Sequence, residues 1–586
     1  MPEPQHAVYV PACAVFPDIE CDFETLRSLL QNLSRTETLV WCARLNLALS
    51  DREMDCVQRH AECIGRFLSP EEKTRVFAYA QRNTSREKRV VLFFRGQLLE
   101  LMRWCTLYSQ DLPGDGETFN DPEVRRRFSQ AALICSDVLN VTVWGTDPVD
   151  DTADALLQGQ VPDLSRKAAE ATATTDLVLS LGRGWAYYRK YLPKHYPAFG
   201  KEFRRATGLS IEQYFACLAM VLVDSRRPPA HAGFRHGRVL QRTTYNEIFR
   251  HYIDLQSQTP GDLRRKWRRG LPMELPVLSE APPFSRRPLL DRPILRTRHR
   301  QAIILDPLFF GESAVAGPLF HALRADPGRA RRLFSAFGKA FEDYVNDILG
   351  RMFPASGLLT HRLHTNQIVV GERGRELEAD ACIIDVGRGV LVETKAAWMR
   401  EDTILTAEHG PYTAFLRTNY VAPHGLQQLA RIIHALSLPR QRKGNRAFNG
   451  VTLIYPVLVV RDQLLSTPYF GRFLHREFQD CLKPDEVVPS SGRMKKGDVT
   501  VTPPIVIDIE TLEGLASCVS QHGFVDLLDE YSRECSDGAT PLGNFIAGSP
   551  KYEPSFNPRE SVGKEFVEAL EATAREVFPE ADLSGL

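Results

Sequence analysis

Apolar residues in the first 290 positions recur every three or four residues, which is the spacing of helices with one buried face. This period predicts helices over 86–110, 121–139, 210–223 and 245–256. Asp121 is a suitable N-cap for the second of them, because Pro122 follows it at the first helical position. The first part of the chain is therefore predicted to be mainly helical.

Strand-like and helical segments alternate after residue 303. The pattern predicts a helix over 329–352, strands over 358–370, 377–386 and 390–394, a helix over 425–437, a strand over 451–460, a strand over 504–509 and a helix over 511–520. Strands interleaved with helices indicate an α/β layer in which helices cover a sheet. A last helix, in an acidic setting, is predicted within 557–586.

Composition adds a boundary between these two halves. The predicted parts are a helical region for binding or sensing over 1–230, a basic, Pro-rich linker over 231–300, an α/β domain over 301–530 and a C-terminal extension over 531–586. The linker holds 15 Lys and Arg against 6 Asp and Glu, in a chain whose 73 basic and 73 acidic residues cancel.

Basic residues around an aromatic one suit a phosphate backbone, although a solvated linker explains the same composition. Candidate nucleic-acid contacts are Arg264, Arg265, Lys266, Arg268 and Arg269 around Trp267, and Lys495 and Lys496 in a basic loop.

Several classes of protein are disfavoured by what the sequence lacks. Its longest apolar stretch, 214–223, has about half of the residues that a membrane-spanning helix needs. The 12 cysteines are scattered singly, which argues against a disulfide framework and against a zinc site. There is no GxxxxGK[ST] motif, so no nucleotide cofactor is expected. We expect a cytoplasmic protein with reduced thiols and no membrane partner.

The segment VLVETKAA carries two candidate catalytic residues, Glu393 and Lys395. Side chains two positions apart on a strand point to the same face, so these two would lie side by side. Alone, the pattern also fits an ion pair at the exposed end of a strand, which is the more common case.

Asp380 changes that interpretation. The strands that contain Asp380 and Glu393 are predicted to form a hairpin with a two-residue turn at Gly387 and Arg388. This register places Asp380 opposite Lys395 and brings two carboxylates and an ammonium group to one face. A turn of three residues would move Asp380 to the other face.

Two crowded carboxylates repel each other, and a divalent cation relieves this repulsion most simply. Mg²⁺ prefers oxygen ligands and takes only one or two protein carboxylates, and Mn²⁺ is expected to substitute for it. Such an ion lowers the pKa of a bound water and neutralises charge on a phosphoryl oxygen. Lys395 beside it would orient or deprotonate the attacking water, or stabilise the transition-state charge. This is the chemistry of phosphodiester hydrolysis.

Asp380, twelve intervening residues and then Glu393-Thr394-Lys395 resemble the signature of the PD-(D/E)XK, or restriction-endonuclease-like, nuclease superfamily. The segment GKAFE, which ends at Glu342, resembles that superfamily's first core helix. The segment GLQQL resembles the helix that follows the ExK strand. The resemblance covers less than half of the chain and implies an α/β (α+β) restriction-endonuclease-like C-terminal domain.

The same resemblance implies the roles of the site residues. Asp380, Glu393, the Thr394 carbonyl and Glu342 would hold the metal, and Lys395 would be the catalytic lysine. Gln427 or Gln428 would help to position the site, and the choice between them stays open. The sequence departs from the family pattern at Ala379, where many members have Pro, and it lacks the Gln-x-x-x-Tyr of helicase-associated nucleases.

The function implied is a Mg²⁺-dependent nuclease, most simply an endonuclease for which DNA is favoured over RNA. A large helical region joined to such a core suggests bacterial anti-phage defence, by analogy alone. A repair nuclease and an inactive, nuclease-like nucleic-acid-binding or assembly protein remain open. A homo-oligomer or a partner subunit is compatible with the sequence.

Overall fold

The computed structural model describes most of the chain, and helices predominate in it. The described residues are 6–49, 64–84, 88–111, 121–144, 177–226, 233–235, 246–269, 286–297, 301–354, 362–371, 374, 376–398, 409–461, 468–488, 491–536, 538 and 540–578.

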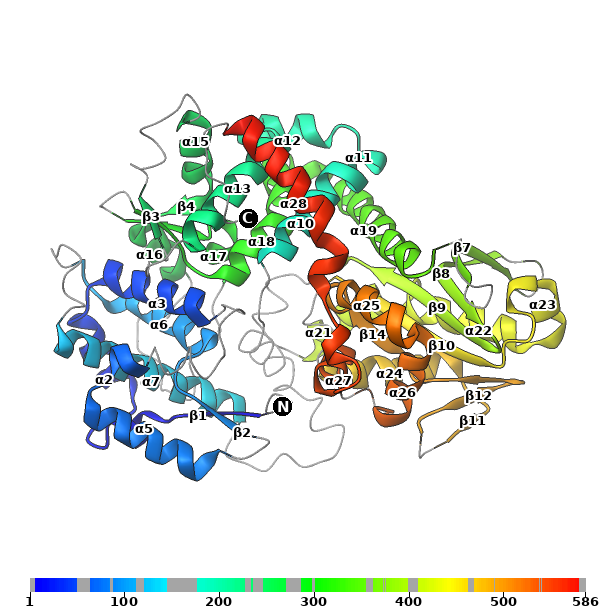
Figure 1. Ribbon diagram of the computed structural model, residues 1–586, viewed down its shortest axis with the longest axis horizontal. Helices are drawn as coiled ribbons and strands as arrows, with labels where there is room; N and C mark the ends of the chain where they lie inside the picture. Colours follow the sequence, from blue (N-terminus) through cyan, green and yellow to red (C-terminus); the bar gives the residue numbers. More distant parts are fainter. Residues whose placement is uncertain are drawn as a thin grey trace.

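The largest sheet has eight strands and contains every strand that the sequence predicted (Figure 1). Its strands lie in the order β11–β12–β13–β10–β9–β8–β7, and β14 pairs with the second half of β10. The pairs β7–β8 and β8–β9 are antiparallel, whereas β9–β10 and β10–β14 are parallel. The strands are β7 (Arg362–Val370), β8 (Glu376–Asp385), β9 (Arg388–Lys395), β10 (Leu453–Val460), β11 (Glu486–Val487), β12 (Met494–Lys496), β13 (Val499–Val501) and β14 (Ile505–Asp508).

Helices cover both faces of this sheet because its central strands are apolar on both sides. Val390 and Val392 of β9 share a buried cluster with Phe341 of α19 (Ala330–Met352), and α25 (Ile509–His522) joins the same cluster. Leu391 points the other way, into a cluster with α22 (Leu426–Ser437) and α24 (Pro468–Leu482). The α/β layer predicted from the alternation of helices and strands is confirmed.

Two hydrophobic clusters organise the helical part. One contains α1 (Ala12–Val15), α2 (Phe23–Gln31), α3 (Arg35–Leu49), α5 (Pro70–Asn83), α6 (Arg95–Tyr108) and α7 (Pro122–Trp144). The other joins one face of the sheet to α10 (Leu177–Trp185), α11 (Leu192–His195), α12 (Phe199–Thr207), α13 (Ile211–Arg226), α15 (Asn246–Gln256), α18 (Pro307–Ala325) and α28 (Pro558–Val577). Helices α10–α13 therefore share a core with the sheet, which differs from the predicted division at residue 230.

The linker prediction for 231–300 is wrong over the described residues. Strands β3 (Gly233–Arg235), β4 (Ser257–Gln258), β5 (Ile294–Arg296) and β6 (Gln301–Ile304) form a four-stranded sheet. Helix α16 (Pro260–Arg268) follows β4 and buries Leu263 and Trp267 in the first hydrophobic cluster, and α17 (Arg287–Asp291) precedes β5. Arginine is frequent here, but the described residues also place Leu263, Trp267 and Ile294 in the two hydrophobic clusters.

One predicted helix is partly wrong. Of the range 86–110, residues Lys88–Val91 form β2, which pairs in parallel with β1 (His6–Tyr9), and α6 begins only at Arg95. The other predicted helices of this half are confirmed as α7, α13 and α15. Asp121 accepts a hydrogen bond from the Glu123 backbone N–H, as expected at the start of α7.

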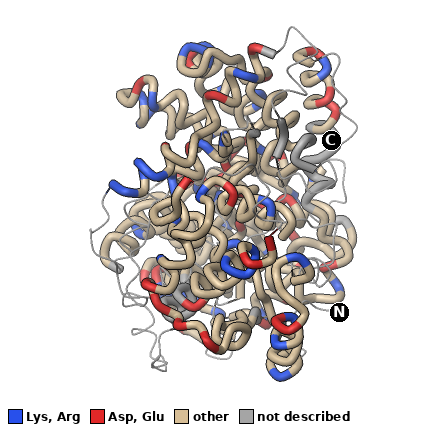
Figure 2. The backbone as a smooth tube through the Cα atoms, turned by 90° about the vertical axis from the view of Figure 1, so that its left-hand side faces the viewer, with Lys and Arg blue, Asp and Glu red and all other residues tan. Residues whose placement is uncertain are grey.

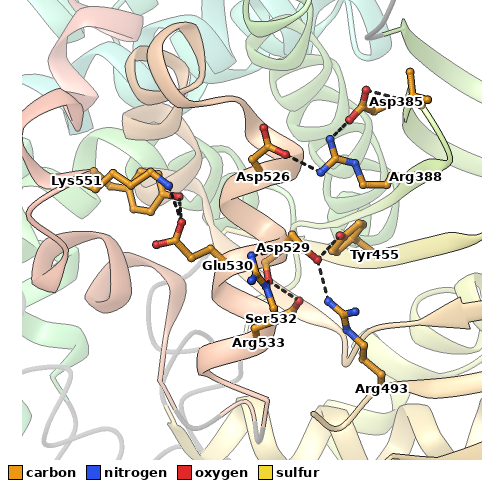
Figure 3. A network of polar contacts seen from close by, with 12 residues as sticks. Asp385, Arg388, Tyr455, Arg493, Asp526, Asp529, Glu530, Ser532, Arg533 and Lys551 are labelled. Carbon is orange, nitrogen blue, oxygen red and sulfur yellow. Dashed lines mark hydrogen bonds and ion pairs between the residues drawn. The ribbon is translucent and has the colours of Figure 1, made fainter.

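A polar network fixes the closed end of the β8–β9 hairpin to α26 (Phe524–Glu534) (Figure 3). Arg388 pairs with both Asp385 of β8 and Asp526 of α26. Asp529, one turn further along α26, accepts hydrogen bonds from Tyr455 of β10 and from Arg493, each at 2.8 Å. The hairpin therefore has a fixed end at its turn and an open end at the candidate site.

Both signs of charge are spread along the described part of the chain, and its cysteines are unpaired. Basic and acidic positions are interspersed along the backbone (Figure 2). The ten cysteines among the described residues are free, and no helix within those residues is long and apolar enough to cross a membrane.

Candidate active site

The β8–β9 hairpin has a two-residue turn, as predicted, but the turn lies one residue earlier than expected. It consists of Val386 and Gly387, so that Asp385 pairs with Arg388. Gly387 takes φ = 71°, which a residue without a Cβ adopts readily. The predicted pairing of Asp380 with Lys395 is therefore wrong, because the register is shifted by two residues. A shift of two keeps each side chain on its predicted face.

The backbone pairing of β8 with β9 ends at Ala381 and Val392. Asp380 and Glu393 are the next residues toward the open end of the hairpin. Asp380 stands on β8 at this open end and accepts two hydrogen bonds from Thr394 of β9, one from the backbone N–H and one from the hydroxyl, each at 2.7 Å. The Asp380 side chain thus takes over the link between β8 and β9 at the point where the main-chain hydrogen bonds between the two strands end.

Glu393 and Lys395 contact each other, as their spacing predicted. The Lys395 ammonium pairs with Oε1 of Glu393 and donates to the Thr394 carbonyl at 3.1 Å. Glu393 is only 2% exposed, whereas 19% of the Lys395 side chain is exposed. The arrangement differs from an ion pair at the surface, because the carboxylate lies inside the protein and only the ammonium reaches solvent.

Glu342 approaches this group from α19. Burial, together with the nearby Asp380 carboxylate, raises the pKa of Glu342 to about 7. Burial also raises the pKa of Glu393 to about 7, against the opposing effect of the Lys395 ammonium. The structure therefore brings together Glu342, Asp380, Glu393, Thr394 and Lys395 from one helix and two strands.

One carboxylate oxygen of this donor set is left open to a cation. The second carboxylate oxygen of Glu393, Oε2, is buried and has no hydrogen-bond partner among the described residues. Such an atom is costly unless something binds it. No three His, Cys, Asp or Glu side chains within the described ranges are placed to hold a metal by themselves. A cation here would therefore need the Thr394 carbonyl and water in addition to carboxylates, which is the coordination that Mg²⁺ accepts.

Of the two candidate glutamines, Gln428 has a defined contact. Its amide nitrogen donates to the Glu378 carbonyl at 2.6 Å and so ties the first turn of α22 to β8, two residues before Asp380. Gln427 is half-buried, and its side chain makes no hydrogen bond within the described part of the chain.

The other basic candidates do not join the site. Lys495 and Lys496 lie on β12, whose neighbour β13 pairs only with the start of β10, at Leu453 and Ile454. Glu393 and Lys395 pair with the opposite end of β10. Lys496 also contacts Asp485 at 3.0 Å, so the predicted basic loop is an ion-paired hairpin.

The basic cluster on α16 is likewise separate. Its helix packs against α6, on the other side of the molecule from the eight-stranded sheet (Figure 1). Arg265 pairs with Asp262, Lys266 donates to Gln258 at 3.0 Å, and Arg264 is half-buried. Arg268 and Arg269 are exposed.

No sequence pattern indicated the side chains that hold the end of β9 at Lys395. Arg461, the residue after β10, donates its backbone N–H to the Lys395 carbonyl at 3.3 Å. Its guanidinium lies 4.3 Å from the ring centroid of Trp398 and pairs with Glu312 of α18 at 2.7 Å. The pairing of Arg461 with Glu312 spans 149 residues, and no local pattern could have revealed it.

Comparisons with protein-family models, with curated proteins and with solved structures found no match for this chain. The candidate site is therefore interpreted from its own geometry.

Proposed function

We propose that this chain is a divalent-metal-dependent nuclease that hydrolyses phosphodiester bonds, with DNA as the preferred substrate and internal cleavage as the preferred mode. The observation that carries the proposal is the meeting of Asp380, Glu393 and Lys395 at the open end of one hairpin, with Glu342 added from the facing helix. Titratable groups whose pKa values are shifted by burial and by a specific charge partner cluster at functional sites.

The arrangement of elements supports a restriction-endonuclease-like assignment. In chain order, α19, β7, β8, β9, α22 and β10 give helix, three strands, helix and strand, with the short helices α21 (His409–Leu416) and α23 (Pro439–Gly444) on either side of α22. This order is similar to the core order of the PD-(D/E)XK superfamily, and the candidate residues stand on the elements where that superfamily carries its own. Fold order alone does not assign chemistry, so the proposal depends on the site.

Asp380, Glu393 and the Thr394 carbonyl would hold the cation, with Glu342 close by. A bound Mg²⁺ would supply the polarisation of a water molecule and of a phosphoryl oxygen. Because the Lys395 ammonium contacts both Glu393 and the Thr394 carbonyl, it must move away from these atoms when they become ligands. Its flexible stem lets Nζ then face the substrate, where it can orient the attacking water or stabilise negative charge.

One observation favours a second candidate, an inactive nuclease-like protein that binds nucleic acid. The Lys395 ammonium already neutralises Glu393, so the pair satisfies itself without a metal. The orphaned Oε2 of Glu393 weighs against this alternative, because a purely structural pair leaves no reason to bury it. Anti-phage defence is the setting we favour for an active enzyme, and DNA repair is the alternative.

A cleavage assay tests the proposal. Wild-type protein is incubated with Mg²⁺ or Mn²⁺ and with single-stranded DNA, duplex DNA (closed circles included) or RNA. We expect metal-dependent products, and we expect Asp380→Asn and Lys395→Ala to lower the rate by at least about a hundredfold. Lys495→Ala, an exposed lysine at the other end of the sheet, should retain full activity. Equal activity in Lys395→Ala, or no metal-dependent product from any substrate, would overturn the proposal.

A further inference from the structure

Five exposed cations on α12 and on the first half of α19 form neither an ion pair nor a cation–π contact with the described residues. They are Lys201, Arg204, Arg205, Arg331 and Lys339, and we call them the cationic face. The chain as a whole has no net charge, so these unneutralised cations form a local excess of positive charge. Such an excess attracts an anionic partner.

The two cations on α19 are aligned with Glu342. At 100° per residue, Lys339 and Glu342 lie about 80° and 20° around the helix axis from Arg331. The rise of 1.5 Å per residue places Arg331 roughly 16 Å and Lys339 roughly 5 Å from Glu342 along the axis. Cations therefore line the same side of the helix that presents Glu342 to the candidate site.

Helix α12 continues this surface beside the start of α19. Glu202 of α12 pairs with Arg329, directly before α19, and Arg332 lies 5.5 Å from the ring centroid of Tyr196, which precedes α12. Lys201, Arg204 and Arg205 occupy the exposed side of α12, opposite the buried Phe203.

The acidic residues of α12 and α19 other than Glu342 are already paired with cations. Asp343, next to Glu342, is contacted by Lys194 at 3.4 Å and by His195 at 3.1 Å. Asp347 pairs with Lys190 at 2.8 Å. The pairing of Glu202 with Arg329 removes a third negative charge, so the exposed sides of α12 and of the first half of α19 are positive overall.

An exposed aromatic ring borders the cations on the side of the hairpin. Phe334 of α19 is 37% exposed, although most large apolar side chains among the described residues are buried. Its ring lies 5.6 Å from that of Trp398, three residues after Lys395, and the Arg461 guanidinium covers Trp398. Exposed rings beside cations are the features with which proteins bind unpaired bases.

We propose that a single strand of nucleic acid binds along the cationic face toward Glu342, with its phosphates on α12 and α19 and one base stacked on Phe334. This inference rests on the proposed function, because it supplies the path by which a substrate reaches that site. A base within a duplex has no free face for Phe334, so stacking selects a single strand or an unpaired end.

Fluorescence anisotropy of a labelled single-stranded oligonucleotide in EDTA measures binding without metal-dependent cleavage. We expect Arg331→Gln/Lys339→Gln and Arg204→Gln/Arg205→Gln each to weaken binding by about tenfold. Each pair should also reduce the slope of log K against log salt by about 1.4, since each phosphate contact on a single strand contributes about 0.7. The matched control is Arg66→Gln/Arg82→Gln, two exposed cations just before and within α5 of the first hydrophobic cluster, which should bind like wild type.

Phe334→Ala separates stacking from charge. It should weaken single-strand binding by roughly tenfold and leave the salt slope and duplex binding unchanged. The proposal is overturned if wild type binds no single strand, if the α5 control loses affinity while the α12 and α19 variants keep it, or if Phe334→Ala binds like wild type. Binding that follows the expected pattern, with no cleavage after Mg²⁺ is added, would sustain this surface and refute the nuclease activity instead.

Discussion

At the scale of single residues, Glu393 carries the largest consequences. A carboxyl whose pKa is about 7 in the folded chain, against an ordinary value of 4.5, binds more protons when the chain is folded. Its contribution to stability is therefore complete below about pH 4.5 and is lost as the pH rises through 7. The metal-free protein is thus expected to become less stable between pH 5 and pH 8.

Glu393→Gln tests this expectation, because an amide does not titrate. The fall in the free energy of unfolding between pH 5 and pH 8, measured by urea denaturation in EDTA, should shrink by on the order of 1 to 3 kcal/mol. The exposed Glu486→Gln serves as control and should keep the wild-type fall. An unchanged pH dependence in Glu393→Gln would show that Glu393 is ionised in the metal-free fold.

The sequence predicted the members of this group better than their contacts. The spacing of Glu393 and Lys395 was enough to place them in contact. The partner of Asp380 could not be predicted, because it depends on which two residues form the turn. Val386 gave no signal for a turn position, since it is apolar and yet 78% exposed.

At the scale of elements, Gly425 sets the entry to α22. Its φ of 138° is reserved for glycine, and a Cβ there would lie 2.3 Å from the Tyr420 carbonyl oxygen. Gly425→Ala should therefore lower the free energy of unfolding by about 2 to 4 kcal/mol. It should also displace Gln428 from β8. Thermal denaturation would measure the loss of stability, and a lower cleavage rate would report the displacement.

Gly444→Ala is the matched control for that variant. Gly444 ends α23 (Pro439–Gly444), and no atom lies within 4 Å of an added Cβ. The substitution should change stability by less than about 1 kcal/mol. If both glycine variants have the same stability, the close approach of Gly425 to Tyr420 is not a constraint on the fold.

Long, strongly patterned elements were predictable, and short polar ones were not. The helix α19 and strands β8, β9 and β10 lie within two residues of their predicted bounds, because an apolar face repeats along each of them. Strands β11 to β13 have two or three residues and include Lys495 and Lys496, so their composition indicates a loop. Their pairing depends on β10, to which β13 attaches.

At the scale of the whole molecule, a buried ion pair joins the helical region to the sheet. Arg183 of α10 donates to both carboxylate oxygens of Glu513 on α25, at 2.8 and 2.6 Å. Tyr344 of α19 donates to the same carboxylate at 2.6 Å. The partners are 330 residues apart, so sequence patterns could not predict the pair. Its burial indicates that the two regions fold together.

Glu513→Gln should destabilise the protein by about 3 to 5 kcal/mol, because the Arg183 guanidinium would remain buried without a counter-charge. The double variant Arg183→Met/Glu513→Leu should recover most of this loss. Chemical denaturation followed by fluorescence measures both. Additive losses in the double variant would show that the two residues do not act as a pair.

The central claim is that the open end of the β8–β9 hairpin binds a divalent cation, and isothermal titration calorimetry with Mn²⁺ or Mg²⁺ at pH 8 tests it most directly. The account predicts saturable binding by wild type and by Lys495→Ala, and affinity at least about tenfold weaker in Asp380→Asn and in Glu393→Gln. Wild-type protein that binds neither ion, or equal affinity in the two carboxylate variants, would contradict it.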